Sequence, residues 1–299
     1  MAKYTYGAAG FAATTFTSPL AGSDDEITAN DSQNFTINGN GGNDVVSTGS
    51  GNDTITTGSG NDTITAGDGN NTVTAGEGTN AVTSGLGNDT ITTGSGDDTI
   101  TAGDGNNTVT AGDGANAVTS GLGNDTITSG AGKDVINSGA GDDIISAGAG
   151  DDIVNSGGGN DIVNAGAGND VVNSGGGTDS LVGAGGHDTF VYGSLAEAQL
   201  GADTIADFST SDPWQAGEGD SLDLRGLVSD FTDMEGGSLA QLVASGHLDF
   251  SAGAGGTVIS FDSNGSAAGG TIGVLANLVG VGFGTEAGSV LTFGDNLLV

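Results

Sequence analysis

The sequence predicts an all-β fold: a parallel β-roll, that is, a β-solenoid with two nonamers per coil, followed by a C-terminal β-rich cap. Nine-residue units follow one another from residue 40 to residue 192, which is 153 residues or 17 nonamers. Each unit has a glycine-rich half and a β-branched half, the pattern of a turn followed by a short strand. The composition then changes after Tyr192, where the repeats end.

The nonamers begin clearly at Gly49 and read GSGNDTITT, GSGNDTITA, GDGNNTVTA and onward. Glycines of the G-x-G-N-D half suit left-handed turn backbone, and the T-I-T half favours a strand with one inward apolar residue. One aliphatic per nonamer cannot fill a core, so two nonamers per coil are expected to form two facing sheets. The expected inward residues are Ile55, Ile64, Val73, Val82, Ile91, Ile100, Val109, Val118, Ile127, Ile136, Ile145, Val154, Val163, Val172, Leu181 and Phe190.

A longer period overlies the nonamers. Residues 49–84 and 85–120 are near-duplicates offset by 36 residues and differ at four positions, which indicates a duplication of four units. Weaker copies of the repeat precede them around Asp24–Ile27 and Asn34–Ile37.

These patterns divide the chain into three parts. We expect an N-terminal segment at 1–39 with degenerate repeats that could add to a neighbour as a strand, the roll at 40–192, and the cap at 193–299. Within the cap, residues 194–200 and 237–245 are expected to form short helices.

The charge of the chain restricts its partners. Thirty-eight acidic residues against three basic ones give a formal net charge of −35, which argues against nucleic acid and calls for bound cations. The absence of cysteine excludes thiol catalysis, and two histidines are too few for a multi-histidine metal site. No apolar run of about 20 residues is present, so membrane insertion is not expected. We find no catalytic or cofactor-binding constellation and expect no enzyme.

The nonamers resemble those of the RTX family, whose repeat G-G-x-G-x-D-x-U-x binds calcium in its turns. Here the first glycine is usually Ala, Ser or Thr, as in Ala66-Gly67, while the G-x-G-x-D core is kept. The resemblance implies calcium ligation by turn carbonyls and by one column of aspartates: Asp44, Asp53, Asp62, Asp89, Asp98, Asp125, Asp134, Asp143, Asp152, Asp161, Asp170, Asp179 and Asp188.

Turns on one edge of the roll are two nonamers apart, so we expect Asp125 to lie next to Asp143 and Asp134 next to Asp152. Seventeen turns then offer up to about 15 calcium sites, seven between two aspartates and eight between Asp and Asn. The mixed sites involve Asn71, Asn80, Asn107 and Asn116. They are expected either to bind calcium more weakly, because affinity follows ligand charge, or to hold no metal.

The C-terminal segment resembles the type I secretion target region that follows RTX repeats. The matching pieces are DTFVYG (188–193), DTIADF (203–208), GDSLDL (219–224) and DNLLV (295–299). The resemblance implies export by a type I secretion system to the extracellular space or the bacterial cell surface.

Two outward-facing features suggest partners. Thr pairs flank the inward residue over five coils, as in Thr54/Thr56 and Thr72/Thr74, which predicts a solvated face or an adhesive or ice-binding one. After residue 130 the first outward position becomes apolar, at Val135, Ile144, Ile153, Ile162 and Val171. We interpret these as a patch that is covered by the C-terminal cap or by a neighbouring subunit. We predict a structural protein that self-assembles as a homo-oligomer, filament or lattice, with cell-surface polysaccharide as a further candidate partner.

Overall fold

A computed structural model describes nine stretches of the chain: residues 2–6, 14–30, 32–194, 201–208, 219–226, 247–253, 256–262, 272–279 and 297–298. The chain divides into two compact units, Met1–Ala149 and Gly150–Val299, and each is described by itself. The helices expected at 194–200 and 237–245 lie outside the described residues, apart from Ser194. In the described part of the chain, no helix is long and apolar enough to cross a membrane.

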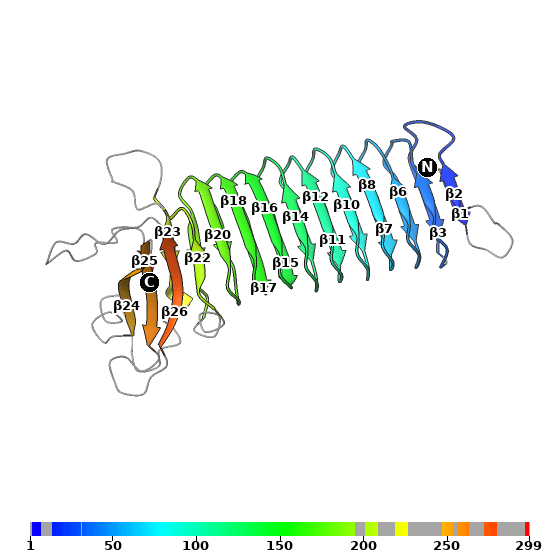
Figure 1. Ribbon diagram of the computed structural model, residues 1–299. Coiled ribbons are helices and arrows are strands. Elements are labelled where there is room, and N and C mark those ends of the chain that lie inside the picture. The colour runs from blue at the N-terminus through cyan, green and yellow to red at the C-terminus, as the bar shows by residue number, and fades with distance from the viewer. Residues whose placement is uncertain are drawn as a thin grey trace. The chain divides into compact units, whose positions relative to one another are not determined.

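Unit 1 consists of two parallel sheets, and successive strands belong alternately to one and to the other (Figure 1). One sheet contains β1 (Ala2–Tyr6), β3 (Asp25–Ala29), β5 (Val45–Thr48), β7 (Thr63–Gly67), β9 (Ala81–Ser84), β11 (Thr99–Gly103), β13 (Ala117–Ser120) and β15 (Val135–Ala140). The other contains β2 (Thr15–Thr17), β4 (Thr36–Asn38), β6 (Thr54–Thr56), β8 (Thr72–Gly76), β10 (Thr90–Thr93), β12 (Thr108–Gly112), β14 (Thr126–Ser129) and β16 (Ile144–Ala149). Two strands therefore make one coil, and the predicted β-roll is confirmed.

Unit 2 begins with the same alternation. Its first sheet contains β17 (Ile153–Gly158), β19 (Val171–Asn173), β21 (Thr189–Val191), β23 (Ser221–Asp223) and β27 (Leu297–Leu298). Its second contains β18 (Ile162–Ala167), β20 (Ser180–Gly185), β22 (Asp203–Ile205), β26 (Ile272–Val279), β25 (Gly256–Asp262) and β24 (Leu248–Gly253). Parallel pairing thus continues past the nonamers through β22 and β23, while β26, β25 and β24 pair antiparallel.

The core of each unit is a ladder of aliphatic side chains. All sixteen residues expected to point inward, from Ile55 to Phe190, are buried. A second buried position, two residues later, carries a small residue such as Ala66, Ala75 or Thr57. At seven such positions this residue has a hydroxyl group that donates a hydrogen bond to a carbonyl one coil further on, as from Thr57 to Ala75 at 2.9 Å. The core is therefore narrow, and these buried hydroxyl groups are satisfied by backbone carbonyls.

The outward faces only partly match the prediction. The Thr ladder is confirmed, because Thr54, Thr72, Thr90 and Thr108 are exposed and pair in register along β6, β8, β10 and β12. The predicted single patch of five aliphatics is wrong. Val135, Ile153 and Val171 belong to odd-numbered strands, whereas Ile144 and Ile162 belong to even-numbered strands of the other sheet. A nine-residue spacing moves each successive residue to the opposite sheet, so a run in the sequence is not a patch on one face.

Candidate metal centre

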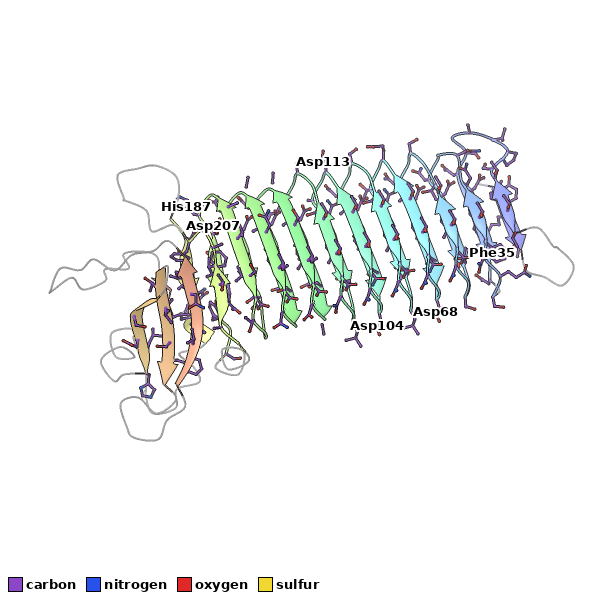
Figure 2. The ribbon with its side chains drawn as sticks, in the orientation of Figure 1. Phe35, Asp68, Asp104, Asp113, His187 and Asp207 are labelled. Carbon is purple, nitrogen blue, oxygen red and sulfur yellow. The ribbon has the colours of Figure 1, made fainter. Side chains whose placement is uncertain are left out.

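The turns place one acidic position of each nonamer in the interior, and we call these positions together the buried column. All thirteen predicted aspartates are buried at the start of the strand half, as Asp125 is directly before β14. Figure 2 shows Asp68 and Asp104 at one edge of the coils and Asp113 at the opposite edge, as expected when successive turns alternate between edges. Turns that share an edge lie 18 residues apart and stack directly on one another.

Each stacked pair is joined by a buried hydrogen bond. The backbone N–H of one column residue donates to Oδ1 of the residue one coil further on, as from Asp125 to Asp143 at 2.7 Å. In unit 1 these bonds link two series: 25, 44, 62, 80, 98, 116, 134 and 35, 53, 71, 89, 107, 125, 143. In unit 2 they link 152, 170, 188, 220 and 161, 179, 203. The expected neighbours Asp125 and Asp143 are thus confirmed, while Asp134 beside Asp152 stays a prediction.

The second carboxylate oxygen has a different environment. Oδ2 is buried and has no hydrogen-bond partner at Asp44, Asp53, Asp62, Asp89, Asp98, Asp125, Asp170, Asp179 and Asp188. A hydroxyl group lies near the carboxylate in some turns, but at Asp62 the neighbouring Thr57 donates its proton to the Ala75 carbonyl. A buried charge with an unsatisfied oxygen is costly unless a cation or a proton is bound there.

The pKa values of the column carboxylates also indicate that their charged form is costly in the folded protein. Burial raises the pKa of Asp44 from its usual 3.8 to about 6, although the Asp25 N–H lowers it, and the nearby carboxylates of Asp62 and Asp25 also raise it. Burial also raises the pKa of Asp188 to about 7, with added repulsion from Asp220 and Asp170. Burial raises the pKa of the other shifted column residues as well: Asp62, Asp89, Asp98, Asp125, Asp143, Asp170 and Asp179.

The asparagine turns reveal what the second oxygen faces. Nδ2 of Asn71 donates to the carbonyls of Gly67 and Gly69, each at 3.1 Å, so the end of the column side chain points at two carbonyl oxygens of its own turn. In an Asp turn the corresponding atom is Oδ2, so three oxygens converge there. Calcium prefers six to eight hard oxygens in a flexible arrangement, and this cluster fits part of such a shell.

The ligands would be mostly backbone carbonyls. Among the described residues, no group of three His, Cys, Asp or Glu side chains is placed to hold a metal ion. A calcium ion in these turns would therefore be held by turn carbonyls together with one or two column carboxylates. That the thirteen aspartates are the ligands stays a prediction that this geometry favours.

Sequence reasoning missed two parts of the site. An exposed column lies just before the buried one, and its side chains accept backbone N–H bonds from the next coil, as Asn52 does from Asn70 at 2.8 Å. The repeated N-D dipeptide is the signal for it. The buried column also extends to Asp25, Asp203 and Asp220, which precede β-branched or leucine residues in DEIT, DTIA and DSLD.

Comparison with known families agrees with this geometry. A model of the RTX calcium-binding nonapeptide repeat matches residues 36–55, 56–91, 92–127, 119–154, 128–163 and 155–190. No curated protein matches the chain. RTX repeats bind calcium and are typical of secreted proteins. The matches cover 36–190, more than half of the chain, so the protein belongs to the family of RTX calcium-binding nonapeptide-repeat proteins.

Proposed function

We propose that this protein is a secreted structural protein that folds when it binds calcium and then self-assembles outside the cell, as a surface layer, filament or matrix. The observation that carries the proposal is a set of nine buried column carboxylates whose second oxygens have no hydrogen-bond partner: those of Asp44, Asp53, Asp62, Asp89, Asp98, Asp125, Asp170, Asp179 and Asp188. Calcium ions at these positions would offset much of the net charge of −35 and allow the coils to stack.

Calcium availability would then decide where the roll forms. Extracellular calcium modules bind in the range of about 0.1–1 mM, far above cytosolic calcium. The chain would stay open in the cell because its carboxylates repel one another, and would fold after export. Export through a type I secretion system is part of this proposal, supported by the C-terminal resemblance and by the family's occurrence in secreted proteins.

Circular dichroism tests the calcium dependence. Protein in chelator is expected to have a reduced β signal that rises cooperatively between about 0.1 and 1 mM calcium. Magnesium at equal concentration is the control and should give little of this gain, because Mg²⁺ requires near-octahedral geometry and keeps its waters. A full β spectrum in chelator that calcium does not change would contradict the proposal.

Self-assembly is supported by exposed aliphatic side chains on the coils. Ile144 and Ile162 are 51% and 54% exposed, and Val171 on the other sheet is 37% exposed. Burying one such side chain contributes roughly 1.5–3 kcal/mol, so several could hold neighbouring molecules together. We propose no catalytic role, because the roll is a calcium-binding structural fold.

Assembly is tested by light scattering and electron microscopy in millimolar calcium. Changing Ile144 and Ile162 to Thr, the residue of the earlier coils, should abolish large particles and leave the calcium-dependent β signal intact. Ile153→Thr, at a less exposed position of the other sheet, is the matched control. A wild-type protein that stays monomeric at high concentration would refute assembly.

The Thr ladder supports a second candidate function, adhesion to ice or to a regular surface such as polysaccharide. Thr72, Thr90 and Thr108 are exposed and in register on adjacent strands, which repeat every ~4.8 Å. Thermal hysteresis that requires calcium and is lost when Thr90 and Thr108 are changed to Lys would favour this function over assembly.

A further inference from the structure

Four buried column positions carry asparagine instead of aspartate: Asn71, Asn80, Asn107 and Asn116. At three of them Nδ2 donates to two turn carbonyls, four and two residues earlier, at 3.0–3.1 Å. At Asn107 it donates to the Gly103 carbonyl at 3.0 Å. These amides therefore supply hydrogens to the same carbonyls that would face a cation in an Asp turn.

Like the aspartates, the asparagines also accept a backbone N–H from the neighbouring coil through Oδ1. Oδ1 of Asn71 accepts the backbone N–H of Asp53 at 3.0 Å, and Oδ1 of Asn107 accepts that of Asp89 at 2.9 Å. This fixes the orientation of the amide, because a rotated side chain would set Nδ2 against an N–H donor and Oδ1 against two carbonyls. A calcium ion at an Asn turn would have to break the amide's bonds to the carbonyls.

The asparagines also separate the charges of the column. Along each edge between Asp53 and Asp134, every aspartate has an asparagine as its neighbour on at least one side. Where two aspartates are neighbours instead, as Asp125 and Asp143 are, two buried carboxylates follow each other one coil apart.

We propose that the four asparagine turns hold no calcium, because their own amides already bind the turn carbonyls. The coils between residues 49 and 120 would then stay ordered at calcium concentrations too low to order the coils after residue 120, which have aspartate at every column position. This inference rests on the proposed calcium function and says which turns bind calcium and which do not. The Asn stretch would be a preformed segment on which the calcium-dependent coils stack as calcium rises, which removes part of the cost of starting the roll.

The test counts calcium ions per chain, by equilibrium dialysis and elemental analysis at about 1 mM calcium. The column variant changes Asn71, Asn80, Asn107 and Asn116 to Asp. The matched control changes four exposed asparagines of the neighbouring column to Asp, which adds the same charge: Asn61, Asn70, Asn88 and Asn106. The column variant should gain about one ion for each new carboxylate, and the control should gain none.

A second readout is the residual structure in chelator. Hydrogen exchange of the wild type should show protected amides between residues 49 and 120, and the column variant should lose this protection while the control keeps it. If the column variant does not fold, Asp89→Asn with Asp98→Asn gives the reverse test: about one ion lost per change, and more β signal in chelator.

The outcomes separate the two proposals. A wild type that binds no calcium would overturn the proposed function itself. A wild type that binds calcium while the column variant binds the same number of ions would overturn only the present inference, as would a wild type with no protected coils in chelator.

Discussion

Acid should stabilise the calcium-free roll. A column carboxylate that binds a proton becomes neutral and can donate a hydrogen bond, as the amide of Asn71 does to the carbonyls of its own turn. The folded-state pKa values of Asp44 and Asp188 are raised above the unfolded value of 3.8, mainly by burial. Their favourable contribution is therefore fully present below about pH 3.8 and is lost as the pH rises through the folded-state pKa values.

The size of the effect follows from two groups with large shifts. The pKa of Asp44 is about 6 and that of Asp188 is about 7, both raised mainly by burial. Each unit of pKa shift corresponds to 1.36 kcal/mol, so full ionisation costs the folded state about 3 kcal/mol at Asp44 and about 4 kcal/mol at Asp188. Between about pH 4 and pH 7 these groups alone would remove several kcal/mol of stability.

The assay is urea unfolding of protein freed of calcium by chelation and desalting, followed by circular dichroism at a series of pH values from about 4.5 to 7.5. The urea midpoint should fall as the pH rises. In saturating calcium the trend should weaken or reverse, because the ion favours the charged carboxylates and competes with protons. A calcium-free midpoint that rises with pH over this range would refute the electrostatic reasoning.

Two further predictions concern the scaffold in saturating calcium. Gly132 has a φ of +137°, and a methyl group there would overlap the carbonyl of Gly114, so Gly132→Ala should cost roughly 1–3 kcal/mol or more in thermal unfolding. Gly185→Ala, in open space, should leave the melting temperature nearly unchanged, and equal losses at both sites would contradict the steric argument. Ile127→Ala should cost about 2–5 kcal/mol in urea unfolding because its side chain is buried, while the exposed Thr126→Ala serves as control; similar midpoints for the two would count against the core.

The strict nine-residue period made much of the roll predictable from the sequence. The period identifies Ile127 as inward and Asp125 as a turn residue without any knowledge of distant contacts. The second buried position was not predictable in the same way, because it alternates between Ala, as at Ala66, and Thr or Ser, as at Thr57, and the latter residue types are mostly exposed in proteins. The hydrogen bond from Thr57 to Ala75 becomes visible only when the coils are stacked.

The nine-residue period does not predict column members where the chain between two coils is longer than in the nonamers. Asp179 and Asp203 are neighbours in the buried column although 24 residues separate them, and 32 separate Asp188 from Asp220. Such insertions hide column members from a search at fixed spacing. Only the local D-x-I and D-x-L patterns could have found them.

The 18-residue step of the buried ladders also governs how a gene for this protein can change in length. Every bond of these ladders within the nonamers joins a residue to its equivalent one full coil away, so adding 36 residues inserts two whole coils and gives each donor an equivalent acceptor. The near-identical segments 49–84 and 85–120 are such an insertion. Gain or loss of a single nonamer would instead exchange the two edges and pair each strand with the wrong sheet. A change of length in whole steps of 18 residues is thus compatible with every bond of the ladders, so the roll could become longer or shorter without any other residue having to change.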